Sequence, residues 1–270
     1  MNHIYSPACL PTQEIESIIR NAAKLMLEAD SARLNVQHKS GSANFVTEFD
    51  VKVQRFLQEH FSALLPGCCF LAEEEGESEN PLSDDYTFII DPIDGTTNFI
   101  QGYRHSCTSV ALLKDGKPYI GVVYNPYNGE LFSAQLGKGA WLNGVRISAA
   151  KGKLEENLVA FGTSPYYRHI SHYFDGTFDT LKKLYPHCQD LRRSGSAALD
   201  LCYVACGRTA LFFELILSPY DYAAAALIVH EAGGLATQMS GEPLNYGQGV
   251  SVLAAGKTAY AEYFDIMTKA

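Results

Sequence analysis

The sequence predicts a layered sandwich in which helices alternate with sheets, α+β in its first half and α/β in its second. Three observations predict it: two amphipathic helical segments near the start, a run of strands and tight turns in the middle, and strands alternating with helices toward the end. The chain has 270 residues, 47% of them hydrophobic, which is ample for one large core or two closely packed ones.

The first half begins with two predicted helices, over 12–34 and from about 47 to 65. Their expected inward positions are Ile15, Ile18, Ala22, Leu25 and Ala29 in the first, and Phe49, Val53, Phe56, Leu57 and Phe61 in the second. The apolar run 86–90 is a candidate buried strand, and 107–148 has the alternation and the Gly-containing turns of a meander.

The second half alternates between strand and helix patterns, which favours an α/β layer. The expected strands are 157–162, 188–195, 209–217 and 250–256, and the expected helices are 168–185, 196–207, 220–234 and 257–269. A charged stretch at 149–156 separates the halves, so we predict two domains, 1–148 and 149–270.

Composition excludes several classes of protein. The net charge is −9 and no basic stripe is present, so we expect no nucleic-acid partner. The N-terminus lacks the pattern of a signal peptide, and no apolar run approaches the roughly 20 residues that span a bilayer. We therefore expect a cytoplasmic protein without membrane association. The seven cysteines match no zinc motif, and we expect free thiols, with Cys202 and Cys206 buried on one apolar helix.

The stretch 89–99, IIDPIDGTTNF, leads an apolar strand into two carboxylates. Asp91 and Asp94 repel each other when shielded from water, and a divalent cation removes that cost. Oxygen-only ligands favour Mg²⁺ over zinc. Gly95 permits a tight turn, and a helix over 96–99 would offer free amides to a phosphate. A plain turn is the alternative, because Asp, Pro and Gly all favour turns, and the spacing fits neither an EF-hand nor a P-loop.

Other acids have structural interpretations of their own. The glutamates at 73–75 have the character of a solvated acidic loop. Asp50 lies three residues after Thr47, and Asp221 lies three residues after Ser218. Both pairs fit a capping box at a helix start, and Pro at the first helical position strengthens the second. Taken singly, each of these two aspartates is better explained as a cap than as a metal ligand.

Taken together, five segments point to a known family. They are KSGSANFVTEFD (39–50), LAEEEG (71–76), DPIDGTTNF (91–99), RSGSAALDL (193–201) and PYDYAAAALIVHEAGG (219–234). In this order the chain resembles, over essentially its whole length, the inositol monophosphatase family of magnesium-dependent, lithium-sensitive phosphatases. The resemblance implies the inositol monophosphatase-like sugar phosphatase fold and a homodimer.

The resemblance also implies a site with two to three Mg²⁺ ions. It assigns Glu73, Asp91 and the carbonyl of Ile93 to the first ion, Asp91, Asp94 and Asp221 to the second, and Glu74 with Glu73 to a weaker third. It implies a catalytic set of Thr96, Asp50 and Glu73, in which Thr96 and Asp50 orient and help deprotonate the attacking water. It implies a substrate-binding set of Lys39, Asp94, Gly95, Thr96, Ala197 and Glu214.

The activity implied is hydrolysis of a phosphate monoester of the myo-inositol 1-phosphate type by in-line attack of a metal-activated water. Several positions depart from the family pattern: Tyr220 stands for Trp, Ala225 for Gly, Asn44 for an acid and Ala210 for Asp. None of these four is a proposed metal ligand. The departures leave related substrates open, namely fructose 1,6-bisphosphate, histidinol phosphate and 3'-phosphoadenosine phosphate.

Further alternatives concern the class of protein. A noncatalytic ligand-binding relative would have lost a metal-binding acid, and none is missing. A zinc site at His169 and His172 is the other alternative, but two such residues on a helix usually face solvent. Arg192 and Arg193 are either ordinary surface cations or contacts for a second anionic group or a subunit partner. The segment 163–175 bears on specificity without a clear pattern, and Tyr220 is expected in the core.

Overall fold

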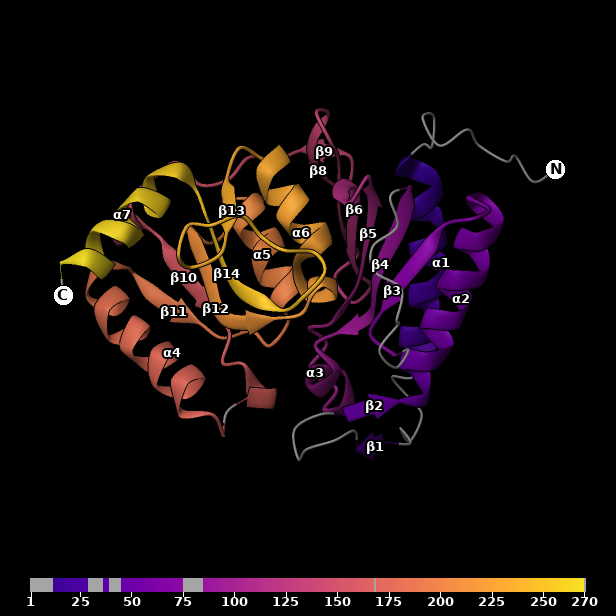
Figure 1. Cartoon of the computed structure of the whole chain (residues 1–270), viewed down its shortest axis with the longest axis horizontal. Helices are drawn as coiled ribbons and strands as arrows, with labels where there is room; N and C mark the ends of the chain where they lie inside the picture. The colour runs from indigo at the N-terminus through magenta and orange to yellow at the C-terminus, as the bar shows by residue number, and fades with distance from the viewer. Residues whose placement is uncertain (1–11, 29–35, 39–44, 75–84, 168, 270) are drawn as a thin grey trace.

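Five layers of helices and sheets alternate across the molecule. The structure is a computed structural model that describes residues 12–28, 36–38, 45–74, 85–167 and 169–269. In Figure 1 the order from right to left is a helix pair, a sheet, a second helix pair, a second sheet and a third helix pair. The predicted layered sandwich is therefore confirmed. Within the described ranges, no helix combines the length and the apolar character that crossing a bilayer requires.

The larger sheet has seven strands in the order β3-β4-β5-β6-β7-β8-β9. Their bounds are β3 Cys69–Ala72, β4 Tyr86–Asp94, β5 Cys107–Lys114, β6 Lys117–Asn125, β7 Glu130–Gln135, β8 Gly139–Leu142 and β9 Val145–Arg146. Strands β3 and β4 pair in parallel, whereas all later neighbours pair antiparallel. The strands from β5 onward are the predicted meander, because short turns join consecutive neighbours.

One face of this sheet is covered by α1 (Thr12–Glu28) and α2 (Glu48–Leu64). Their apolar faces and the sheet share a core that includes Met26, Phe61 and Phe88. Within the described residues α1 ends at Glu28. Several of the residues that it buries lie one position after the predicted ones. Ile19, Ala23 and Met26 are buried, whereas Ile18 and Leu25 lie at the edge of the core. The short pair β1 (Val36–His38) and β2 (Phe45–Thr47) precedes α2.

The smaller sheet has five strands in the order β11-β10-β12-β14-β13. Their bounds are β10 Leu158–Phe161, β11 Asp190–Arg192, β12 Leu211–Leu217, β13 Leu235–Thr237 and β14 Val250–Ala255. Strand β10 runs parallel to both of its neighbours, and β14 runs antiparallel to β12 and β13. The three-residue strand β13 was not predicted, because it is too short for a periodic pattern.

The middle layer consists of α5 (Ala197–Ala205) and α6 (Pro219–Glu231), which pack between the two sheets. Residues 222–229 of α6 are all buried, so this helix is apolar on every side, as expected for one covered from both faces. The outer layer consists of α4 (Ser171–Leu184) and α7 (Lys257–Thr268). The short α3 (Thr96–Ile100) follows β4. The predicted boundary between 1–148 and 149–270 stays a prediction.

Candidate active site

Strand β4 carries the two aspartates of the central motif into the site. Asp91 is opposite Ser109 on β5, and Asp94 is opposite Cys107, so three steps along β4 match two along β5. Side chains three apart on a regular strand point to opposite faces. The extra residue at this irregularity turns the strand, and both carboxylates reach one site.

Gly95 ends the strand and begins α3. Its φ of 84° lies in the left-handed region that favours glycine. A side chain there would begin 3.1 Å from the carbonyl oxygen of His105 and 3.2 Å from that of Gly195, so a close approach of backbone also demands glycine. Thr96 is the first residue of α3 and is buried, and its hydroxyl donates to the carbonyl oxygen of Ile93 at 3.1 Å.

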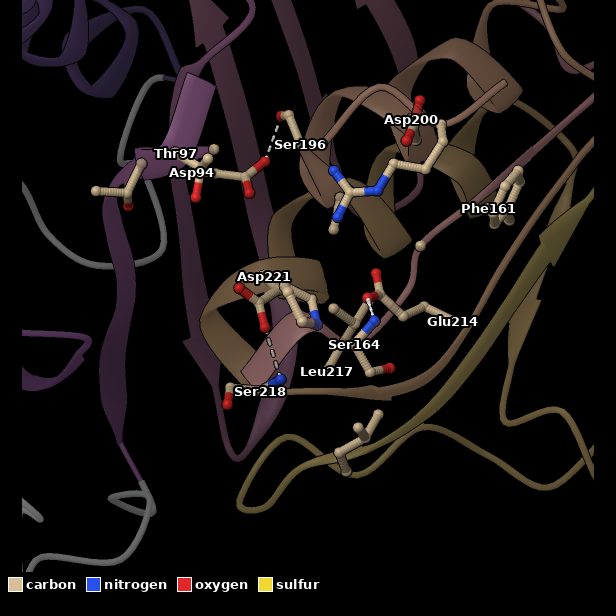
Figure 2. A pocket seen from close by; sticks show the side chains of 18 of the residues that line it. Asp94, Thr97, Phe161, Ser164, Ser196, Asp200, Glu214, Leu217, Ser218 and Asp221 are labelled. Atoms are coloured by element: carbon tan, nitrogen blue, oxygen red, sulfur yellow. Dashed lines mark hydrogen bonds between the residues drawn. The ribbon is translucent and has the colours of Figure 1, made fainter. Parts of the chain in front are cut away.

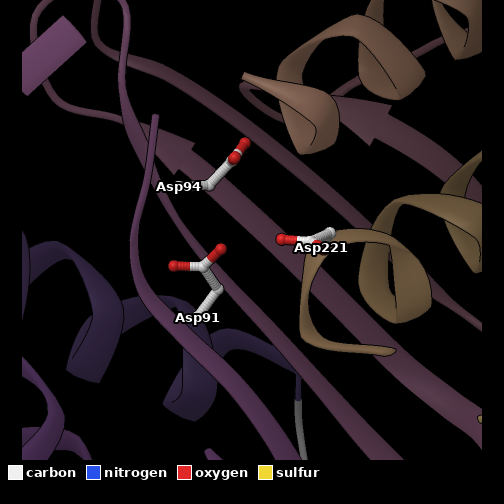
Figure 3. A group of neighbouring side chains, drawn as sticks. All are labelled: Asp91, Asp94 and Asp221. Carbon is white, nitrogen blue, oxygen red and sulfur yellow. The ribbon is translucent and has the colours of Figure 1, made fainter. Parts of the chain in front are cut away.

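The third aspartate comes from the start of α6. Ser218 precedes this helix, Pro219 is its first residue, and the backbone N–H of Ser218 donates to Oδ2 of Asp221 at 2.7 Å. This hydrogen bond confirms the cap prediction. The same geometry fixes the carboxylate beside β4, so the cap does not exclude a ligand role. Figure 3 shows Asp91, Asp94 and Asp221 around one small space, and each has a carboxylate oxygen within 4.8 Å of the others.

Burial and mutual repulsion make this cluster costly when all three groups are charged. Burial raises the pKa of Asp91 well above its usual value, and the charges of Glu73 and Asp94 raise it further. Burial likewise raises the pKa of Asp221, with Asp94 as the next cause. Oδ1 of Asp91 is buried and has no hydrogen-bond partner among the described residues. A cation at this point would satisfy that oxygen and remove the repulsion, so the residues fit a hard divalent ion.

The remaining expected metal ligands lie near this cluster. The structure places Glu73 directly after β3, where its charge raises the pKa of Asp91 and Asp221. Glu74 is half-buried, and its backbone N–H donates to Oε1 of Gln54 at 3.0 Å. A fully solvated acidic loop is therefore the wrong interpretation for these two glutamates.

Asp50, on the first turn of α2, is fully buried, and its charge also raises the pKa of Asp91. The pairing of Asp50 with Thr96 stays a prediction. Lys39 lies outside the described residues.

Asp94 is held by α5, which sequence reasoning did not anticipate. Ser196 caps this helix, and its hydroxyl donates to Oδ2 of Asp94 at 2.5 Å. The backbone N–H of Ala198 donates to the same oxygen at 2.9 Å, and the thiol of Cys107 approaches it at 3.6 Å. All three donors converge on Oδ2 and so fix the orientation of the carboxylate. Ser before an apolar helical run is an N-cap signal that was present in the sequence.

A cavity of about 470 Å³ opens beside the cluster. Figure 2 shows Asp94 and Asp221 toward one side of it, and Asp200, Glu214 and Phe161 toward the other. The expected substrate residues Gly95, Thr96 and Ala197 line it as well.

Glu214 is the most enclosed of the expected substrate contacts. It accepts a hydrogen bond from the backbone N–H of Ser164 at 2.7 Å, and burial raises its pKa to about 7. A side chain at Gly162 would begin 1.8 Å from Oε2 of Glu214, so glycine is required there.

Three further residues line the cavity. Asp200 is buried, accepts a hydrogen bond from the hydroxyl of Ser194 at 2.7 Å, and has its pKa raised to about 8 by burial. Arg193 also faces the cavity, whereas Arg192 does not. Tyr220 packs against the core but is only half-buried and lines the cavity, so the expectation of a purely core residue was incomplete.

The alternative zinc site receives no support from the described geometry. The one group of potential metal ligands in the described ranges is the aspartate cluster. His169 and His172 are both exposed beside the start of α4, away from that group. The cysteines described, which are Cys68, Cys69, Cys107, Cys188, Cys202 and Cys206, are all free thiols. Cys202 is buried as expected, but Cys206 is only half-buried because it ends α5.

Comparison with known proteins decides the family. A model of the inositol monophosphatase family matches residues 10–268. The chain belongs to the inositol monophosphatase family. Inositol monophosphatase 2 of Solanum lycopersicum is 41% identical over 213 residues, which cover 77% of this chain and 79% of the relative. Nus factor SuhB of Vibrio cholerae serotype O1 is 37% identical over 217 residues, which cover 80% of each.

Solved structures of the inositol monophosphatase family have the same fold. The extragenic suppressor protein suhB of Bartonella henselae superimposes with a TM-score of 0.87 at 32% identity, over 95% of this chain and 98% of that one. The IMPase of Thermotoga maritima gives 0.83 at 30% identity, over 94% of both. Membership supports a metal-dependent phosphatase. The relatives carry both inositol monophosphatase and SuhB names, so membership alone does not choose the substrate.

Proposed function

We propose that the protein is a Mg²⁺-dependent phosphomonoesterase that hydrolyses myo-inositol 1-phosphate or a similar polyol phosphate. The observation that carries the proposal is the cluster of three carboxylates beside a cavity and the Gly95 turn, in which a buried Asp91 oxygen has no hydrogen-bond partner among the described residues. A phosphate dianion would be repelled by this cluster alone. Magnesium ions bound there would neutralise it, contact the phosphate oxygens and acidify a water.

The chain's own residues have separate tasks in this proposal. Asp91, Asp94 and Asp221 hold the cations, with Glu73, Glu74 and the Ile93 carbonyl completing the ligand set. Asp50 and Thr96 together orient the attacking water and help to deprotonate it, with the Asp50 carboxylate as the base, and the turn at Gly95 and Thr96 offers backbone amides to the phosphate. The tasks of Asp91, Asp94 and the Gly95 turn all depend on one geometry, which is the irregular end of β4.

The alcohol part of the ester would occupy the cavity. Ala197 and Glu214 line it, which supports a role for both in contacting hydroxyl groups of a polyol. Glu214 suits this role because a neutral carboxylic acid can both donate and accept hydrogen bonds, and its pKa of about 7 keeps much of it neutral in the cytoplasmic range. Lys39 belongs to the proposal through the family resemblance alone, as do lithium inhibition and a homodimer. The absence of a nucleic-acid partner and a cytoplasmic location remain predictions.

The test is phosphate release from four esters. These are inositol 1-phosphate, fructose 1,6-bisphosphate, histidinol phosphate and adenosine 3',5'-bisphosphate, each with Mg²⁺, with a chelator and with added lithium. We expect Mg²⁺-dependent, lithium-sensitive release, greatest from inositol 1-phosphate. A preference for another ester keeps the mechanism and corrects the substrate. Absence of release from all four, with Mg²⁺ binding demonstrated by calorimetry, would favour the noncatalytic ligand-binding alternative.

A further inference from the structure

The cavity has a strongly asymmetric distribution of charge. Four acids line it, namely Asp94, Asp200, Glu214 and Asp221. Among the described residues that line it, Arg193 is the one cationic side chain. The bound cations of the proposed function would act on the side of Asp94 and Asp221. They leave unexplained the guanidinium group of Arg193, which lines the same cavity.

The position of Arg193 is set by contacts on both sides. Its Nη2 donates to Oγ1 of Thr163 at 3.0 Å. Its Nη1 lies 2.6 Å from the point where a side chain on Gly195 would begin. Gly195 in turn contacts the Gly95 turn, because its carbonyl oxygen lies 3.2 Å from the point where a Gly95 side chain would begin. The backbone of Gly195 therefore lies between the guanidinium group of Arg193 and the proposed phosphate-binding turn at Gly95.

The neighbouring arginine has a different environment. Arg192 forms an ion pair with Oδ2 of Asp190 at 2.5 Å and also donates to the carbonyl oxygen of Leu191 at 2.7 Å. In the part of the chain that the structure describes, the hydrogen bond of Arg193 goes to a neutral hydroxyl, and no carboxylate lies within ion-pair distance of it. A guanidinium group has five N–H donors in a planar fork that matches a phosphate or a carboxylate.

Burial weakens the negative charge of the two acids on the same wall. It raises the pKa of Glu214 to about 7 and that of Asp200 to about 8, although the charge of Arg193 opposes part of this shift in both. Both groups therefore favour their neutral forms in the slightly acidic range. Neutral carboxylic acids can also donate hydrogen bonds to an anion bound beside them.

We propose that Arg193 forms a subsite for a second anionic group, so that among esters of closely matched alcohols the enzyme favours the one whose alcohol part carries another phosphate or a carboxylate. The inference rests on the proposed phosphatase function and specifies its substrate class. The cations bind the phosphate that is cleaved, and Arg193 binds the anion that stays on the alcohol. Arg193 is thus a specificity-determining residue.

Two sets of substrates isolate the effect of the second anionic group. Fructose 1,6-bisphosphate is compared with fructose 1-phosphate and fructose 6-phosphate, and 2-phosphoglycerate is compared with glycerol 2-phosphate. The first set varies a phosphate and the second varies a carboxylate, so they distinguish the two sources of charge. We measure kcat and KM for phosphate release at saturating Mg²⁺. In the wild type, the ester with the extra anionic group should have the highest kcat/KM in at least one of the two sets.

The decisive variant is Arg193→Gln, with Arg192→Gln as the matched control. Loss of a charge-assisted contact should lower the kcat/KM advantage of the extra anion by roughly 10- to 100-fold, mainly through KM. Arg193→Lys should restore part of it. Arg192→Gln should keep the advantage within about twofold of the wild type, because its ion pair is exposed. If Arg193→Gln fails to fold, added KCl provides the test, since screening should erode the advantage in the wild type.

Three outcomes would overturn the inference. One is a wild type with no advantage for either extra anion. Another is an equal loss for all esters in Arg193→Gln, which would make the residue a structural clasp between Thr163 and Gly195. The third is an equal loss together with a smaller particle in size-exclusion chromatography, which would make it a subunit contact. Failure of the proposed function is a separate result, because the wild type would then release no phosphate from any ester.

Discussion

The carboxylate of Asp94 is subject to two opposing effects. Three donors from α5 and β5 converge on Oδ2, which fixes the orientation of the group. The same carboxylate has an oxygen within 4.8 Å of oxygens of Asp91 and Asp221. The hydrogen bonds to Oδ2 stabilise the charged form of this buried carboxylate, whereas the negative charges of Asp91 and Asp221 destabilise it. Its proposed role in metal binding and its cost to stability can therefore be separated by experiment.

Replacing Asp94 with Asn should abolish turnover and keep the fold. The amide oxygen can still accept from Ser196 and Ala198, but one negative charge of the cluster is lost. In the presence of a chelator, the variant should unfold at the same temperature as the wild type or higher, because like-charge repulsion falls. Phosphate release and thermal unfolding by circular dichroism measure the two effects. Near-normal activity with Mg²⁺ would contradict the ligand assignment of Asp94.

Replacing Glu214 with Gln should change how stability depends on pH. The pKa of Glu214 is raised by burial to about 7, above the value in an unfolded chain. Its stabilising contribution is therefore complete below pH ~4.5 and is lost as pH rises to about 7. We measure the melting temperatures of Glu214→Gln and of the wild type in the presence of a chelator. The difference between them, variant minus wild type, should increase from pH 5 to pH 8. A difference that stays constant with pH would show that this carboxyl is not shifted.

At the level of secondary structure, the N-termini of two helices position acidic groups of the candidate site. The N-terminus of α5 positions Asp94 through Ser196, and the N-terminus of α6 carries Asp221 in its first turn. Both helices belong to the middle layer, so they are fixed by packing on each face. A residue mounted on the first turn of a buried helix has little freedom to move. The cap interactions therefore position functional groups as well as satisfying backbone N–H groups.

Replacing Ser196 with Ala should weaken metal binding more than it weakens the fold. The change removes the donor to Asp94 and the helix cap, and loss of a cap costs about 1 kcal/mol. Loss of a group that orients a metal ligand typically lowers metal affinity or activity by roughly 10- to 100-fold. Calorimetric titration with Mg²⁺ and thermal unfolding separate the effects. Ser196→Thr, which keeps the hydroxyl, should stay close to the wild type, and unchanged Mg²⁺ affinity in Ser196→Ala would refute the positioning role.

At the scale of the whole molecule, the site is assembled from distant segments. Residues 91–96 come from the end of β4 and the start of α3, 194–200 from the loop and helix start that follow β11, and 214–221 from the end of β12 and the start of α6. They meet where the middle helical layer separates the two sheets (Figure 1). A cation held by Asp91, Asp94 and Asp221 would therefore link segments from both halves. Such a link stabilises the folded state, because the unfolded chain does not hold these acids together.

Adding Mg²⁺ should raise the melting temperature of the wild type. A ligand at 100 times its dissociation constant stabilises the folded state by about 2.7 kcal/mol, which corresponds to roughly 5–10 °C for a domain of this size. Matched ionic strength from NaCl should give a much smaller shift. In Asp94→Asn the Mg²⁺-dependent shift should shrink. Equal shifts in both proteins, measured by differential scanning fluorimetry, would place the bound ion elsewhere.

The sequence by itself determined the types and order of nearly all elements, because amphipathic periodicity and turn residues are local signals. It also marked the motif around Asp91 and Asp94, the cap at Asp221, and the family resemblance that joins them. It did not show β13, the partial exposure of Tyr220, or the contact of Asp94 with Ser196, 102 positions away. Only the tertiary structure decided these, because they depend on strand pairing and layer packing between residues far apart. The convergence of three repelling carboxylates, and the position of Arg193 on the wall of a cavity that two of them also line, are properties of that packing.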